Sequence, residues 1–489
     1  MKIIFIFFLS LLLVINVKAS EIKFDNYFTD ETMRIDYHHM GDAEFEMISI
    51  DRIYRYGTWA GSINNLIDNL NNGKYYLKVY DFESGKLLYS KGFDTYFGEY
   101  QTSAEALNGI KKTYHETALI PYPKNKIRFS IEKRDKKNNL AGIFSAEINP
   151  NDQYIVKDKI VDSSVKIIKQ KNNGDPHIKI DITVMGDGYT KSETEKFQKD
   201  FERLTKTLFE IEPYKSNQDK FNFYGILKPS EESGSDEPGA DIFKNTAFGT
   251  TFYSLGSERY LLTEDNKSVR DIAANVPYDA LVIIVNHNRY GGGGIYNLFC
   301  TLTSDNQWFE YLFLHEFGHS FAGLADEYYT SDVAYNEFYK IDVEPVEPNL
   351  TALVDEDEFK WKEFVNNGVE IPTLWEKAQF DSMDLKWQEE RRTLNEKITE
   401  LKKNKAISDE ISKVQEEYNK KDKLHAQKVT DFLENSKYSG KVGAFEGAGY
   451  LSNSLYRPMI DCLMFSKGKK PYCKICESAV LGVIKRYIE

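Results

Sequence analysis

Short runs of alternating apolar and polar residues fill the first third of the chain. Residues 75–80 (YYLKVY) and 127–131 (IRFSI) are examples, and this alternation predicts strands with one buried face. Turn-forming pairs, Asn72-Gly73 and Ser84-Gly85, separate such runs. The pattern predicts an N-terminal β-sandwich domain over residues 20–150.

The pattern changes in the second part of the chain. The polar stretch 151–176 ends in NGDP and is expected to form a linker. Beyond it, strands alternate with a helix: the expected strands are 178–185, 221–227 and 280–286, and the helix is 192–209. The continuous LVIIV run at 281–285 is typical of a central strand with two buried faces. Residues 177–489 are therefore predicted to form an α/β domain, which makes the chain α+β and multidomain.

A charged stretch with helical period occupies residues 383–435. Trp387, Leu394 and Ile398 lie on one apolar stripe, and Val414 and Tyr418 lie on another. A break near residues 404–408 predicts an antiparallel helical hairpin inserted into the second domain. The hairpin is either a solvated spacer or an arm that restricts or recruits substrates.

The segment His315-Glu316-Phe317-Gly318-His319 carries the clearest chemical signal. Residues four apart share one face of a helix, so both imidazoles can bind one zinc ion. Glu316 is placed to act as the general base towards a water on that ion. The alternative is a buried helix whose histidines only satisfy backbone groups.

Catalytic zinc usually has three protein ligands, and the third must come from downstream. The spacing H-E-x-x-H-x-x-G-x-x-H is broken here, because Gly323 comes one residue late and Ala325 occupies the third-histidine position. Asp326 is the favoured third ligand because its offset from Gly323 equals the glycine-to-ligand offset of that motif. Glu327 is the alternative.

Two more segments are expected near the metal. Met464 is predicted to form a methionine turn beneath it, with Met459 as the alternative. The glycine run that includes Gly292, Gly293 and Gly294 precedes the histidine helix, and it lacks the G-K-[ST] ending of a phosphate loop. These glycines are expected to lie on an edge strand that binds substrate by strand addition.

These motifs resemble those of the IgA peptidase family, which are bacterial zinc metallopeptidases of metzincin-like type. The resemblance rests on residues 315–319 with 323–328, and it is extended by the segments 185–190, 442–447 and 457–464, and by 57–62 near the N-terminus. It implies an N-terminal β-sandwich, a zincin-like catalytic domain and one catalytic zinc. It also implies that the shifted glycine and aspartate are the family's own pattern.

The start of the chain is typical of a signal peptide. An apolar run at residues 3–17 precedes Lys18-Ala19-Ser20, so cleavage after Ala19 is expected to remove residues 1–19. A retained membrane anchor is the alternative, although the run is short for a span of about 20 residues. The protein is therefore expected to be exported, whether periplasmic, on the cell surface or secreted, with no stable membrane span.

The net charge and the cysteine content limit the classes of function that the chain can have. Loss of Lys2 and Lys18 with the signal peptide changes the net charge from −13 to −15. The chain is acidic and has no cluster of basic residues, which argues against nucleic-acid binding. The four cysteines are Cys300, Cys462, Cys473 and Cys476. A zinc ribbon would need a second closely spaced pair, so Cys473 and Cys476 are interpreted as structural, and a disulfide to Cys462 is left open.

The sequence thus predicts a secreted zinc-dependent endopeptidase that acts on protein or peptide substrates, possible host glycoproteins among them. The alternative from another class is a non-catalytic surface module that binds protein or glycan and keeps a metal site. The intact Glu316 favours the enzyme.

Overall fold

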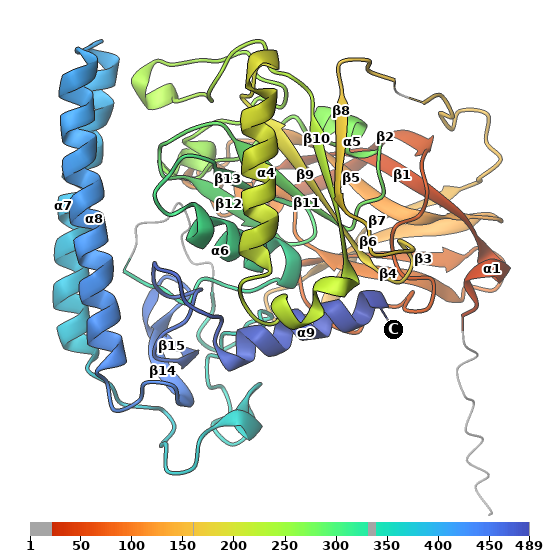
Figure 1. Ribbon diagram of the computed structural model, residues 1–489. Helices are drawn as coiled ribbons and strands as arrows, with labels where there is room; N and C mark the ends of the chain where they lie inside the picture. The colour runs from red at the N-terminus through yellow and green to blue at the C-terminus, as the bar shows by residue number, and fades with distance from the viewer. Residues whose placement is uncertain (1–21, 160, 331–338, 489) are drawn as a thin grey trace, which may run out of the picture.

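The computed structural model describes residues 22–159, 161–330 and 339–488, and the expected signal peptide lies outside these residues. Figure 1 shows the arrangement of the chain. The N-terminal region contains α1 (Phe24–Tyr27), β1 (Phe28–Gly41), β2 (Glu46–Arg55), β3 (Tyr75–Asp81), β4 (Leu87–Phe93), α2 (Tyr96–Tyr100), α3 (Ala104–Leu107), β5 (Lys112–Pro123), β6 (Ile127–Arg134) and β7 (Leu140–Ile148).

Two antiparallel sheets build this N-terminal region. Their strand orders are β2-β1-β5 and β4-β3-β6-β7. Alternate residues of both sheets point into one shared core, for example Ile35 of β1, Val79 of β3 and Phe129 of β6, all with no solvent exposure. The apolar-polar alternation in the sequence therefore marks the buried face correctly, and the region is β-rich as predicted.

The second region contains β8 (Lys166–Lys171), β9 (Ile180–Asp187), α4 (Thr194–Leu208), β10 (Phe221–Leu227), α5 (Asn266–Ala273), β11 (Ala280–Val285), β12 (Gly292–Ile295), β13 (Phe299–Thr303) and α6 (Phe309–Ala322). It continues with α7 (Lys377–Lys403), α8 (Ser408–Glu434), β14 (Val442–Ala448), β15 (Leu451–Met459) and α9 (Lys474–Ile488). Helices and several sheets are mixed in this region.

A six-stranded sheet organises the second region, with strand order β12-β13-β11-β9-β10-β8. Strands β13, β11, β9 and β10 are parallel, whereas β12 and β8 run antiparallel at the two edges. The LVIIV run lies in β11, between β13 and β9, so this strand is internal as its continuous apolar pattern predicts.

The expected linker is in part a strand. Residues 166–171 form β8, which pairs with β10 at the edge of the sheet. Its sequence, KIIKQK, is rich in lysine, and lysine on an edge strand discourages pairing with further chains. Composition alone hides such a strand, since its pairing partner lies about fifty residues downstream.

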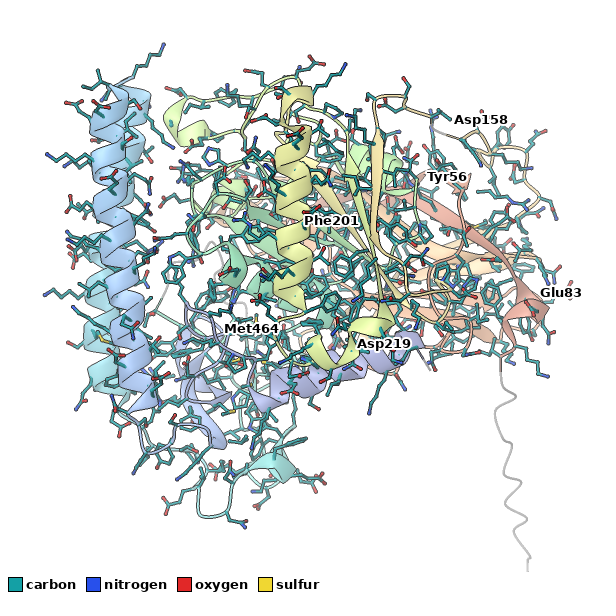
Figure 2. The ribbon with its side chains drawn as sticks, in the orientation of Figure 1. Tyr56, Glu83, Asp158, Phe201, Asp219 and Met464 are labelled. Atoms are coloured by element: carbon teal, nitrogen blue, oxygen red, sulfur yellow. The ribbon has the colours of Figure 1, made fainter. Side chains whose placement is uncertain are left out.

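Helices cover both faces of the six-stranded sheet. One face packs against α4, α6 and α9; Phe201 of α4, labelled in Figure 2, belongs to this core and lies against Gly225 of β10. The other face packs against α5 and against the aromatic residues of α2, which belongs to the N-terminal region. The two regions therefore share a core and form one body.

Helices α7 and α8 form the expected hairpin, with the turn between Lys403 and Ser408. Figure 1 shows the hairpin at the side of the molecule opposite β1 and β2. A small apolar seam of Leu394, Ile398, Val414 and Tyr418 holds its two arms together. None of the helices within the described residues combines the length and apolar character needed to cross a bilayer.

Candidate metal centre

Helix α6 presents the two histidines and then turns the chain back over them. It ends at Ala322, and the capping residue Gly323 has a φ of 62°, in the left-handed region that glycine adopts without strain. The Gly323 N–H donates to the carbonyl of His319 at 3.0 Å. This turn explains why Asp326, only seven residues beyond His319, can reach both imidazoles.

The three predicted ligand atoms converge on one point. The Nε2 atoms of His315 and His319 are 3.2 Å apart, and Asp326 Oδ1 lies 2.9 Å from the first and 3.2 Å from the second. Metal bonds of about 2.0–2.1 Å place tetrahedral ligand atoms about 3.3 Å apart. The donor set and its spacing therefore fit a zinc ion with a fourth position left open.

The other atoms of these side chains are held by partners of their own. His319 Nδ1 lies 2.6 Å from the carbonyl of Leu324, and His315 Nδ1 lies 3.3 Å from that of Leu463. The hydroxyl of Tyr450 donates to Asp326 Oδ2. Such contacts put the ring protons on Nδ1 and leave Nε2 and Oδ1 free to bind a metal.

Charge at the site favours a cation between the three side chains. Burial lowers the pKa of His319, but the neighbouring Asp326 raises it, and the resulting pKa is about 9. Burial raises the pKa of Asp326, but the two imidazoles outweigh it and hold that pKa well below its usual range. Asp326 Oδ1 is buried without a regular hydrogen bond, although both Nε2 atoms are near. Buried groups with this geometry suit coordination better than hydrogen bonding.

Glu316 is half-buried and lines the same pocket as His315, His319 and Asp326. Burial raises its pKa, which the two histidines lower in turn. Its side chain lies against β12: a Cβ added to Gly292 would be 3.0 Å from Glu316 Cγ and Oε1. A raised pKa suits a group that takes up and returns a proton.

The glycine run lets the backbones of β12 and α6 approach each other closely. A Cβ on Gly294 would be 2.3 Å from the carbonyl oxygen of Glu316, so only glycine lets α6 approach β12 this closely. Gly292 and Gly294 line the pocket, whereas Gly293 faces Tyr260 on the other side of the strand. The outer edge of β12 already forms a β-bridge to Tyr260 at Gly292. A substrate strand therefore has less of this edge to pair with.

Met464 lies beneath α6, where it is fully buried. A Cβ on Gly318 would be 3.1 Å from its Sδ atom, and Leu463, the preceding residue, contacts His315. Figure 2 labels Met464 in this position below the sheet. The alternative residue, Met459, is only half-buried at the end of β15.

The pocket beside the three predicted ligands is lined by several elements. The helical hairpin supplies Trp387 and His425, whose rings stack at 5.4 Å, and the N-terminal region supplies Asp94. The hairpin therefore forms one wall of the pocket instead of projecting away from it. Further lining residues are Arg259, Tyr290, Tyr328 and Asp422.

Sequence reasoning missed two groups of residues near the ligands. Tyr450 lies 124 residues beyond Asp326, in the turn between β14 and β15, and no local signal marks it. Glu327, the unchosen acid, turns away from the histidines towards Cys462, Cys473 and Cys476. The spacing of Cys473 and Cys476 was a usable signal, but their partners lie on separate segments.

Comparison with known families covers both regions of the chain. The family model described as IgA Peptidase M64 matches residues 168–484, and the model described as Peptidase M64 N-terminus matches residues 23–145. No curated protein matches the chain. The protein is a peptidase, and the chain belongs to the IgA peptidase M64 family.

Proposed function

We propose that the protein is a zinc-dependent endopeptidase whose active site comprises His315, Glu316, His319 and Asp326. The observation that carries the proposal is the convergence of His315 Nε2, His319 Nε2 and Asp326 Oδ1 within 3.2 Å of one another. Glu316, adjacent in sequence, opens into the same pocket. Two imidazoles, one carboxylate and a nearby acid are the groups that catalytic zinc sites use.

A bound zinc ion supplies a Lewis acid that acidifies water and polarises the scissile carbonyl. His315, His319 and Asp326 hold it, and the backbone carbonyls of Leu324 and Leu463 fix the imidazoles in the required tautomer. Glu316 accepts a proton from the attacking water and later donates it to the leaving amine. Tyr450 keeps Asp326 oriented through Oδ2.

The setting of the site supports the rest of the proposal. The antiparallel edge strand β12 beside α6 is the arrangement of a zincin-like domain with Met464 as the methionine turn, and the two N-terminal sheets are assigned as a β-sandwich. Substrate chains pair with the part of β12 around Gly294. The apolar run at residues 3–17 supports export of the enzyme.

Digestion of a peptide library tests this function. The purified wild-type chain is expected to cleave peptides, to stop on chelation and to recover when zinc is returned. Glu316→Gln, which keeps the shape of the side chain, is expected to lower the rate by about 10²–10⁴-fold with an unchanged zinc content. A zinc-loaded wild-type chain that cleaves nothing but binds protein or glycan would instead establish a binding module.

A further inference from the structure

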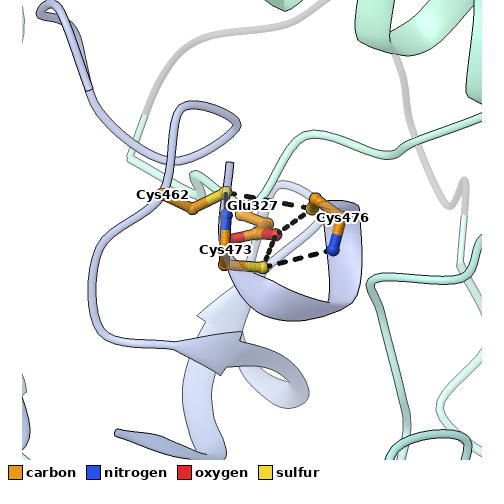
Figure 3. Close-up of side chains that lie close together, drawn as sticks. All are labelled: Glu327, Cys462, Cys473 and Cys476. Atoms are coloured by element: carbon orange, nitrogen blue, oxygen red, sulfur yellow. Dashed lines mark hydrogen bonds between the residues drawn. The ribbon is translucent and has the colours of Figure 1, made fainter. Parts of the chain in front are cut away.

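A second cluster of ligand-type side chains lies directly behind the first. Glu327, Cys462, Cys473 and Cys476 point towards one another, as Figure 3 shows, and they come from three separate segments of the chain. All four are buried: Glu327 and Cys476 have no solvent exposure. Their ligand atoms lie within 4.8 Å of one another. The peptidase mechanism uses none of these groups.

The distances within this cluster fit a tetrahedral metal site. Cys462 Sγ and Cys476 Sγ are 3.8 Å apart, and Glu327 Oε1 lies 3.1 Å from Cys476 Sγ and 3.8 Å from Cys473 Sγ. Zinc–sulfur bonds of about 2.3 Å give tetrahedral sulfur–sulfur edges of about 3.8 Å, and zinc–oxygen bonds of about 2.0–2.2 Å give sulfur–oxygen edges of about 3.5 Å. The observed spacings lie around these values.

Backbone donors surround the sulfur atoms as they would surround thiolates. Cys462 Sγ accepts from the N–H groups of Cys473 at 3.1 Å and Met464 at 3.4 Å. Cys473 Sγ accepts from the N–H of Cys476 at 3.5 Å. Cys473 and Cys476 also stand at the N-terminus of α9, where the helix dipole favours negative charge.

Glu327 is oriented by Asn349 and keeps one oxygen free. Asn349 Nδ2 donates to Glu327 Oε1 at 3.1 Å and to the carbonyl of Ala325 at 2.9 Å. Glu327 Oε2 is buried without a hydrogen-bond partner. A buried carboxylate next to three thiols is costly unless a cation neutralises it, and a divalent metal would do so.

A disulfide is the competing use of these cysteines in an exported protein. All four cysteines of the chain are free in the structure. Linking Cys462 to Cys476 would leave Cys473 and Glu327 buried with no role, whereas a metal uses all four groups at once. The four-group set with no open position is the pattern of structural zinc.

We propose that Glu327, Cys462, Cys473 and Cys476 form a second, structural zinc site. This site stabilises the segments beneath the catalytic pocket. Each thiol releases its proton to solvent as it binds the ion. The site joins the loop that carries Asp326, the turn that carries Met464 and the start of α9. The backbone N–H of Glu327 donates to the carbonyl of Met464 at 2.9 Å, which ties the first two segments directly.

Cobalt substitution of the wild-type chain tests the site without any cysteine variant. The full mature protein is stripped of metal under reducing conditions and reconstituted with two equivalents of Co²⁺. Thiolate-to-cobalt charge-transfer absorption in the near ultraviolet is expected, because three sulfur ligands bind the ion, while the histidine site contributes no such band. Absence of this absorption would overturn the proposal.

Metal counting separates this site from the histidine site. The wild-type chain is expected to hold two zinc ions, and His315→Ala/His319→Ala is expected to hold one. Adding Cys473→Ser and Cys476→Ser to that variant should remove the remaining ion, whereas adding Cys300→Ala, a buried cysteine on β13 outside the cluster, should leave it. These counts do not depend on peptidase activity, so the proposal can fail while the proposed function holds, and the reverse.

Counting free thiols distinguishes a metal site from a disulfide. Non-reducing denaturation with an alkylating agent is expected to label all four cysteines of the zinc-loaded wild-type chain. Recovery of a disulfide among Cys462, Cys473 and Cys476, or a wild-type chain that loses its only zinc with the His315→Ala/His319→Ala change, would overturn the second site.

Discussion

Two clusters of ligand-type side chains meet at a single peptide bond, and they differ in donor atoms and in access. Asp326 joins two imidazoles at the wall of a pocket, whereas Glu327 joins three thiols in the core. Three ligands with an open side suit catalysis, and four buried ligands with sulfur donors suit structural support. Neighbouring acids in a chain can therefore serve opposite purposes, because successive side chains point in different directions.

Replacing each of the two acids in turn tests the difference between the two clusters with the largest expected effect. Asp326→Ala is expected to release one zinc ion and to lower the rate of peptide hydrolysis by more than about 10²-fold. This loss exceeds the one expected for a residue that only orients a ligand. Glu327→Gln is expected to keep the histidine-site zinc and measurable hydrolysis, but to lower the melting temperature. Activity, zinc content and thermal unfolding of both variants are measured in parallel. Equal loss of hydrolysis in both would show that the clusters do not divide their roles.

Gly294→Ala sharpens the comparison at the open side of the histidine site. The new Cβ would lie 2.3 Å from the carbonyl oxygen of Glu316, so α6 or β12 must shift by about 1 Å, which can lower kcat/KM by about 10²-fold. Gly142→Ala on β7 is the matched control, because a Cβ there meets nothing within 4 Å. Unchanged kinetics for Gly294→Ala would contradict the tight contact between α6 and β12.

Tyr450→Phe produces the smallest expected change. It removes the hydroxyl that donates to Asp326 Oδ2, so the zinc affinity of the histidine site is expected to fall by about 10–100-fold. Metal competition with a chromogenic chelator measures this affinity, and the thiolate site should keep its zinc throughout. Tyr154→Phe, at an exposed position in the segment between β7 and β8, serves as the control. Equal affinities in the two variants would leave Tyr450 without a positioning role.

Local sequence patterns predicted much of the fold. The expected strand 221–227 has the same bounds as β10, and the break expected near residues 404–408 coincides with the turn of the hairpin. Both features depend on residues close together in the chain, where hydrophobic period and turn chemistry act directly. Strand β8 was missed because its pairing with β10 is set by distant residues.

The same division applies to the two candidate metal sites. His315, Glu316 and His319 lie on one helix, so their spacing alone places them together. The cysteine cluster joins residue 327 to residues 462–476, and only the folded chain brings these segments into contact. The offset from Gly323 favoured Asp326 over Glu327 as the third ligand, and the structure brings Asp326 to the histidines while Glu327 lies with the cysteines.

The most direct measurement is anomalous diffraction at the zinc absorption edge from crystals of the full mature chain. Two peaks are predicted: one about 2.0–2.2 Å from His315 Nε2, His319 Nε2 and Asp326 Oδ1, and one among the sulfur atoms of Cys462, Cys473 and Cys476. A zinc-supplemented crystal in which His315, His319 and Asp326 point apart, with no peak between them, would contradict the assignment of a zinc peptidase.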